Sequence, residues 1–231
     1  MVVTGNTFFY EWEVALMSWL QANVGPLGIK LATFFTQFAQ PVIIILIVGL
    51  VYWGIDKKYG KYIMAAMVSV SLWGTMIKNV ALRRRPYFDH ESIDCLRPVE
   101  PGDVNDISLQ GFSFPSLHAA NSITLYTLIG KYMKSTVWKV ICFILPLLVG
   151  LSRVFLGVHY PTDVLFGWIF GLLVMLLIDF LYKKLPDPIW IFVILMVTGL
   201  PGFFFCKSTD FYTAYGLIIG AFFAFLFEKS M

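Results

Sequence analysis

The chain has 231 residues, of which 58% are hydrophobic and 13% are charged, and its mean hydropathy is +0.77. Soluble domains are nearer to half apolar and a quarter charged, so this composition excludes an ordinary soluble domain and predicts one integral-membrane domain over residues 1–231. The formal net charge of +3 is too small and too scattered for a nucleic-acid-binding protein, and the three cysteines lack the spacing of a metal site or a disulfide framework.

The N-terminal residues 8–37 mix aromatic and polar side chains, and Gly25 and Pro26 interrupt them. This pattern predicts two short helices that lie at the membrane interface, with Trp12 and Trp19 as anchors. We therefore expect residues 1–37 to form an interfacial N-terminal segment.

Longer apolar runs follow, each close to the length that a helix needs to cross a bilayer. They cover residues 38–55, 62–80, 114–133, 138–157, 161–182, 189–206 and 211–227. The predicted fold class is all-α: a polytopic membrane bundle of about seven transmembrane helices preceded by the interfacial helices.

The lysines between these runs fall on one side of an alternating topology. They are Lys57, Lys58, Lys61, Lys131, Lys134, Lys139, Lys183, Lys184 and Lys229. The positive-inside rule makes that side cytoplasmic, together with the C-terminus, in the cell membrane. The loop 86–113 then lies outside, and its acidic residues are typical of a solvated surface, although a loop of this length could also be a lid. His90 within it has no spacing partner and is interpreted as a surface residue.

Three consecutive arginines, Arg83, Arg84 and Arg85, are the exception to this charge pattern, because they fall on the outer side. An anionic ligand would explain them. The alternative is that the charges at the other links simply outweigh these three.

The segment Ser152–Asp163 places an arginine, a histidine and an aspartate between two apolar runs, where ionisable groups are costly without partners. Pro161 predicts a helix that begins near Tyr160, with His159 at its N-terminus. The carboxylate four residues later could then orient the imidazole. Taken alone, the simpler interpretation is a histidine that caps a helix beside a structural aspartate.

A second polar stretch ends the run 62–80. Lys78 and Arg85 are seven residues apart, nearly two helical turns, which predicts one shared helix face, and Pro86 is expected to end that helix. Taken alone, these residues are typical of cations that extend from a helix end toward the membrane surface.

A third polar stretch begins the run 114–133. Pro115 suits the first helical position and Ser113 could cap the helix, which would place Ser116 and His118 in its first turn. A helix N-terminus attracts anions, so the three stretches together predict a phosphate site at the outer membrane face.

The joint pattern K-x6-RP, PSxH and SR-x5-H-x3-D, in this order, resembles the type 2 phosphatidic acid phosphatase superfamily over roughly residues 60–180. The second motif of that family usually reads PSGH, and here Leu117 replaces the glycine. A side chain at this position would narrow the pocket or change how closely the backbone approaches phosphate, which would affect the size of the substrate.

The resemblance implies a helical core and a role for each motif residue. His159 would attack phosphorus and form a phosphohistidine, Asp163 would hold its imidazole, and His118 would act first as acid and then as base. The resemblance further implies a phosphate-binding set that consists of Lys78, Arg85, Ser116, Leu117 and Arg153. It implies no metal and no other cofactor, and cationic side chains suit phosphoryl transfer.

Three functions remain open from the sequence. The first is a phosphatase that acts on a membrane lipid in the bilayer, such as phosphatidate, phosphatidylglycerophosphate, a sphingoid phosphate or undecaprenyl diphosphate. The second is a sugar-phosphate phosphatase of the glucose-6-phosphatase type. The third, a transporter or channel, ranks low because the charges gather at one face instead of recurring through successive spans. The preference between monophosphate and diphosphate and the oligomeric state also stay open.

Overall fold

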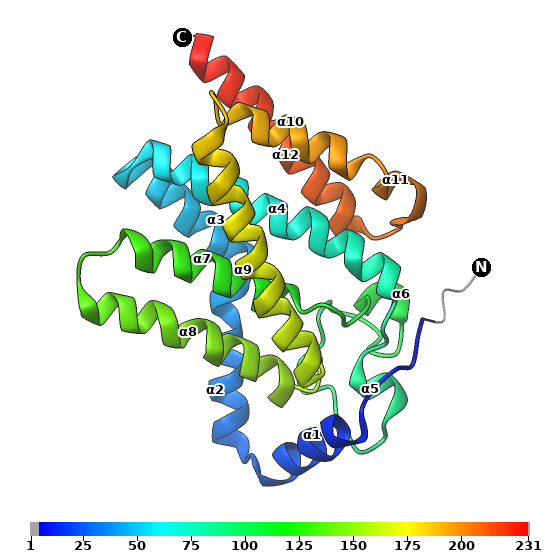
Figure 1. The fold of residues 1–231 in the computed structure, drawn as a ribbon. Helices are drawn as coiled ribbons and strands as arrows, with labels where there is room; N and C mark the ends of the chain where they lie inside the picture. The colour runs from blue at the N-terminus through cyan, green and yellow to red at the C-terminus, as the bar shows by residue number, and fades with distance from the viewer. Residues whose placement is uncertain (1–4, 231) are drawn as a thin grey trace.

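The computed structural model describes residues 5–230, and within them the regular secondary structure is helical apart from an isolated bridge between Asn6 and Arg83 (Figure 1). The predicted all-α class is confirmed. In chain order the elements are α1 (Glu11–Asn23), α2 (Pro26–Thr36), η1 (Gln37–Ala39), α3 (Pro41–Leu50), η2 (Val51–Ile55), α4 (Lys57–Ala81), α5 (Pro86–Asp89), α6 (Ile107–Gln110), α7 (Leu117–Tyr132), α8 (Thr136–Phe155), α9 (Pro161–Lys184), α10 (Ile189–Gly199), α11 (Gly202–Phe205) and α12 (Thr209–Ser230).

Within residues 5–230, four helices are long and apolar enough to cross a membrane: α4, α8, α9 and α12. A bent pair, Pro26–Ala39 with Pro41–Ile55, turns by 48° and would make a fifth span. The structure therefore supports four or five candidate spans and does not show the seven that we predicted. One reason is that α7 has only 16 residues. Another is that the apolar run 189–206 is divided between α10 and the short α11.

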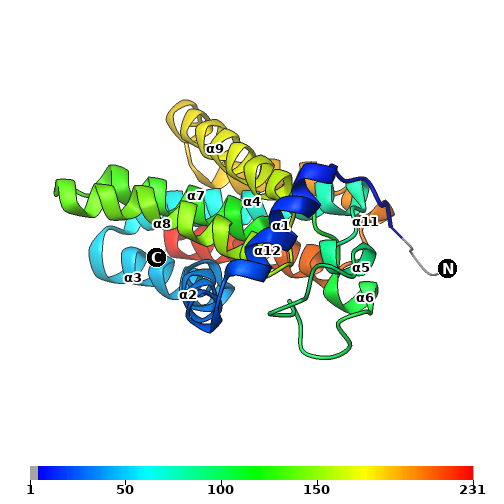
Figure 2. The same ribbon diagram turned by 90° about the horizontal axis from the view of Figure 1, so that it is seen from below.

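The N-terminal region forms two helices separated at Gly25 and Pro26, as predicted. The structure has no boundary at residue 37, because α2 and η1 together form the first half of the bent pair. Helix α2 also packs along α8. Helix α1 lies across the end of the bundle where α8 ends and α9 begins, as seen from below in Figure 2. Two parts of residues 1–37 thus pack differently, one along the bundle and one across its end.

Two predicted helix boundaries are wrong. Helix α4 ends at Ala81, where Leu82 adopts a left-handed conformation with φ 52° and its N–H donates to the Lys78 carbonyl; Pro86 begins α5 instead of ending α4. Helix α7 begins at Leu117 and not at Pro115, because Ser116 is the N-cap and its hydroxyl accepts from the Ala119 N–H. The predicted start of α9 at Pro161 is confirmed.

Glycines on α9 bring this helix against α7. A Cβ atom at Gly167 would lie 2.5 Å from the Ser116 carbonyl oxygen, and one at Gly171 would lie 2.5 Å from the Ala120 carbonyl oxygen. Only a residue without a side chain allows this approach. The close contact places the start of α7 beside the start of α9, where the second and third motifs lie.

Candidate active site

The three polar stretches meet at one end of the bundle, where α4 ends and α7 and α9 begin (Figure 1). The Ser116 N–H donates to the Asp163 carbonyl oxygen at 3.0 Å, which joins the second and third motifs. Arg85 of the first motif lies with one guanidinium nitrogen 3.4 Å from Nε2 of His159. The structure therefore brings together residues that are up to 85 positions apart between Lys78 and Asp163.

Arg85 reaches the site by a route that the sequence did not predict. Because α4 ends at Ala81, Lys78 and Arg85 do not share a helix face; the chain turns at Leu82 and returns Arg85 to the site. The buried guanidinium donates from Nε to the Gln110 carbonyl at 3.0 Å and from Nη1 to the Val158 carbonyl at 2.9 Å. Backbone oxygens thus hold this cation in a fixed orientation.

Lys78 occupies the last turn of α4 and is also buried. Its ammonium group donates to the Phe112 carbonyl at 2.7 Å and lies 3.4 Å from the Ser113 carbonyl oxygen. Both oxygens belong to the chain that leads into α7. Lys78 therefore connects the end of α4 to the end of the loop 86–113.

His159 lies between α8 and α9 with 2% of its surface exposed. Burial, followed by the charges of Arg85 and Lys78, lowers the pKa of His159 well below its usual range, so the imidazole is neutral near pH 7. Since Arg85 carries only donors, Nε2 is the acceptor and Nδ1 holds the proton. This tautomer leaves a lone pair on Nε2, as a nucleophile requires.

Asp163 is fully buried and is held from two sides. Its Oδ1 accepts from Arg83 Nη1 at 2.7 Å, and its Oδ2 accepts from the Tyr160 N–H at 2.8 Å. Nδ1 of His159 lies 3.6 Å from Oδ2, beyond hydrogen-bond distance. The carboxylate is close enough to act on the imidazole by its charge.

Other nitrogens of the predicted site residues are buried and have no hydrogen-bond partner in the described part of the chain. They are Nε2 of His118 and Nε of Arg153, while Nη1 of Arg153 donates to the Thr36 hydroxyl at 2.8 Å. Buried polar groups without a partner are rare in folded proteins. Nitrogens of this kind suit an oxygen-rich group such as phosphate.

Leu117 begins α7 and packs toward α4. A Cβ atom at Gly74 of α4 would lie 2.4 Å from Cδ2 of Leu117, so the leucine side chain occupies the space that Gly74 leaves free. The residue that departs from the PSGH pattern thus makes a contact between two helices of the core.

Sequence reasoning missed Glu13 and Arg83. Glu13 of α1 is 0% exposed and Arg83 is 1% exposed, and they form an ion pair of 2.7 Å. Arg84 pairs with Asp89 at 3.0 Å. Carboxylates of the protein itself therefore account for two of the three consecutive arginines. An acidic residue inside the apolar side of α1 is the signal that could have identified Glu13.

The interpretation of His90 as a surface residue without a partner is wrong. His90 is partly buried, its Nε2 lies 3.1 Å from the Tyr160 hydroxyl, and its ring meets Phe9 edge to face. The loop 86–113 is thereby joined to the residue that caps α9.

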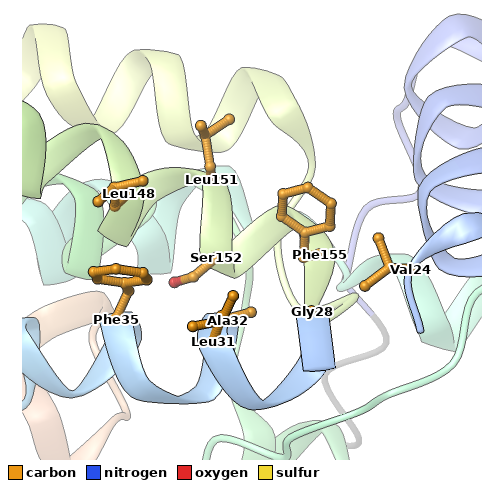
Figure 3. Close-up of a pocket in the computed structure, with 9 residues that line it drawn as sticks. All are labelled: Val24, Gly28, Leu31, Ala32, Phe35, Leu148, Leu151, Ser152 and Phe155. Atoms are coloured by element: carbon orange, nitrogen blue, oxygen red, sulfur yellow. The ribbon is translucent and has the colours of Figure 1, made fainter. Parts of the chain in front are cut away.

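An apolar pocket of about 260 Å³ lies between α2 and α8 (Figure 3). Ser152 contributes to its wall and is followed by Arg153 of the third motif. The lining residues are Val24, Gly28, Leu31, Ala32, Phe35, Leu148, Leu151, Ser152 and Phe155. Phe35, another lining residue, precedes Thr36, whose hydroxyl accepts from Arg153. Across residues 5–230, no group of three or more His, Cys, Asp or Glu side chains is arranged to hold a metal ion.

The fold and the site together define a membrane helical protein in which a neutral, buried histidine lies among cations at one end of the bundle. A family model described as the PAP2 superfamily matches residues 59–186, more than half of the chain. The chain belongs to this superfamily, which confirms the resemblance seen in the motifs.

Individual relatives match smaller parts of the chain. It is 36% identical over 105 residues to phosphatidylglycerophosphatase B of Bacillus subtilis, covering 41% of this chain and 50% of that protein. It is 31% identical over 119 residues to undecaprenyl-diphosphatase of Sulfolobus acidocaldarius, covering 50% of this chain and 51% of that one. The chain thus spans about half the length of these curated relatives.

Two solved structures share the fold. LpxE of Aquifex aeolicus superposes with a TM-score of 0.62 at 20% identity, over 73% of this chain and 95% of that one. The PAP2-type phosphatidylglycerolphosphate phosphatase of Bacillus subtilis gives 0.60 at 23% identity, over 76% and 87%. These likenesses establish the helical architecture.

Proposed function

We propose that this protein is a metal-independent membrane phosphatase that hydrolyses a phosphate monoester or diphosphate of a lipid through a phosphohistidine intermediate. The observation that carries the proposal is the buried imidazole of His159, whose Nε2 lies 3.4 Å from the Arg85 guanidinium. A nucleophile held against a cation is positioned to meet a phosphoryl group.

In the first step, Nε2 of His159 attacks phosphorus, and a P–N bond forms as the bond to the leaving oxygen breaks. Burial and the neighbouring cations lower the pKa of His118 in the free protein. The negative charge of the bound phosphate offsets those cations, so that His118 is protonated in the complex and gives a proton to that oxygen. The cations Lys78, Arg85 and Arg153 stabilise the negative charge on the other phosphoryl oxygens. The ring of His159 becomes positively charged, and the carboxylate of Asp163 stabilises it.

In the second step, a water molecule attacks the phosphohistidine. His118, which is now neutral, takes a proton from the water as its oxygen bonds to phosphorus. The P–N bond breaks and its electron pair returns to Nε2. Inorganic phosphate leaves, and both histidines regain their starting protonation states.

Two observations favour a lipid over a sugar phosphate. The first is the apolar pocket between α2 and α8, which offers space for a hydrocarbon chain (Figure 3). Its lining residues Phe35 and Ser152 are followed in the chain by Thr36 and Arg153, which are hydrogen-bonded to each other. The names of the curated relatives are those of lipid phosphatases. The substrates we propose are therefore amphiphiles, such as phosphatidylglycerophosphate or undecaprenyl diphosphate.

Purified protein in detergent, assayed for phosphate release, tests the substrate class. The panel contains phosphatidylglycerophosphate, phosphatidate, a sphingoid phosphate, undecaprenyl diphosphate and glucose 6-phosphate. We expect release from one or more lipids, persistence in EDTA and inhibition by vanadate. Turnover of the sugar phosphate alone would replace the lipid assignment, and a complete dependence on magnesium would contradict the mechanism.

We further propose that the site faces the extracytoplasmic side and that the C-terminus is cytoplasmic. Lys61 at the start of α4 pairs with Glu228 near the end of α12, at the opposite end of α4 from Lys78. The lysine-rich end would be cytoplasmic. A cysteine label at residue 100 should react from outside intact cells, whereas one at residue 58 should not; the reverse pattern would invert the orientation.

A further inference from the structure

A buried chain of charges connects the N-terminal helix to Asp163. Arg83 donates from Nη2 to Oε2 of Glu13 at 2.7 Å and from Nη1 to Oδ1 of Asp163 at 2.7 Å. All three side chains are at most 1% exposed. One guanidinium therefore bridges a carboxylate of α1 and the carboxylate beside the proposed nucleophile.

Arg83 is fixed on every side. Its Nε donates to the Phe8 carbonyl at 2.9 Å, and its guanidinium carbon lies 4.0 Å from the centre of the Tyr160 ring and 4.7 Å from that of Phe8. Stacking between two aromatic rings and planar donation to two carboxylates are features that arginine provides and lysine does not.

Glu13 makes a second connection to the start of α9. Its Oε1 accepts from the Thr162 hydroxyl at 2.6 Å and from the Thr162 N–H at 3.1 Å. Arg83 Nη1 also donates to the same hydroxyl at 2.8 Å. The first turn of α9, which begins two residues after His159, is therefore hydrogen-bonded to α1 through both the side chain and the backbone of Thr162.

The charges of this network have a chemical consequence. Glu13 and Asp163 each carry one negative charge and Arg83 one positive charge, so the sum is −1. If Arg83 faced Asp163 alone, the pair would be neutral and would do little for a positively charged imidazole. Glu13 compensates Arg83, so that Arg83 can fix Asp163 in place while a net negative charge remains beside Nδ1 of His159.

We propose that Glu13 and Arg83 are positioning residues for phosphoryl transfer, which orient Asp163 and maintain the negative charge that stabilises the ring of His159 as it is phosphorylated. This inference rests on the proposed function. In this arrangement α1 completes the active site, although it lies outside the residues 59–186 that the family model matches.

The test compares Glu13→Gln with Glu11→Gln in the purified full-length protein. Both changes remove one negative charge from α1 at nearly constant shape, but Glu11 is exposed. We expect Glu13→Gln to lower kcat by about 10- to 100-fold with KM changed less than about threefold, because the network does not touch substrate. Glu11→Gln should match the wild type.

Two further variants separate positioning from folding. Arg83→Lys keeps the positive charge but loses the planar guanidinium that can donate to two carboxylates at once. We expect this variant to retain more activity than Arg83→Met. Thr162→Val removes one hydroxyl and no charge, and should lower kcat by about fivefold. Thr162→Val also tests the inference if the charge variants do not yield folded protein by size-exclusion chromatography.

Rapid-quench measurement of phosphoenzyme formation gives the second readout. Glu13→Gln should slow the appearance of the phosphohistidine to the same degree as it lowers kcat. If Glu13→Gln or Thr162→Val lowers the melting temperature while kcat stays within about twofold of the Glu11→Gln value, the network is structural and the inference is wrong. A wild-type protein that is inactive on every substrate would instead refute the proposed function.

Discussion

The two ends of the bundle use the same kind of interaction in opposite surroundings. At the site end, Arg83 pairs with Glu13 and Asp163, and these side chains are at most 1% exposed. At the other end of α9, Lys183 pairs with Asp179 at 2.6 Å, but the lysine side chain is 71% exposed. In the buried network the guanidinium donates to a carboxylate from each of its two Nη atoms, whereas at the surface water competes for both charged groups.

The burial of an ion pair therefore indicates its contribution to stability better than the number of ion pairs does. Removing one partner of a buried pair leaves an uncompensated charge, at a cost of about 3–5 kcal/mol. A solvent-exposed pair four residues apart on a helix contributes about 0.3–0.5 kcal/mol.

The largest effect is expected at His159. His159→Ala should eliminate the covalent intermediate and lower kcat by about 10⁴-fold or more, because the nucleophile is lost. Rapid quench with labelled phosphate substrate measures the intermediate. Covalent label that persists in this variant would show that another residue is the nucleophile.

His118→Ala should separate the two chemical steps. Substrates with poor alkoxide leaving groups should slow by about 10²- to 10⁴-fold, since they need the proton. An activated aryl phosphate should still phosphorylate His159, and the intermediate should then accumulate because water lacks its base. The trapped species should be acid-labile and stable to base. Equal slowing on aryl and alkyl phosphates, without accumulation, would contradict this division of roles.

Arg83→Met should have the largest effect on stability. It leaves Glu13 and Asp163 buried without their shared cation, so the free energy of unfolding should fall by about 3–5 kcal/mol. The matched change at the opposite end, Lys183→Met, should lower it by about 0.5 kcal/mol at most. Denaturation in detergent measures both. A similar loss for the two variants would remove the distinction between the two ends.

Leu117→Gly should have a smaller and more selective effect on catalysis. If the Leu117 side chain limits the space for substrate beside the phosphate site, the preference among substrates should change more than the turnover of the best one. The contact with Gly74 offers a control: Gly74→Ala should cost about 1–3 kcal/mol in stability, and Leu117→Gly should relieve much of that cost. An equal loss of activity on all substrates would identify Leu117 as a packing residue.

The sequence predicted some boundaries well and others poorly, for physical reasons. Pro161 determined the start of α9 because its ring fits the first helical turn. Hydropathy could not show where α10 ends, nor that α2 and α3 meet at 48°, because an apolar run has the same composition whether its helix is continuous or broken. The seven predicted spans therefore became four or five candidates.

By itself, the amino-acid sequence determined the all-helical membrane class, the superfamily and the identity of the motif residues. These features depend on composition, on spacing and on short-range effects of proline. Only the tertiary structure decided how Arg85 reaches His159, through the left-handed turn at Leu82. It alone also joined Arg83 to Glu13, 70 residues away, and to Asp163, 80 residues away. A contact over such a separation depends on the packing of several helices, and no local pattern in the chain specifies it.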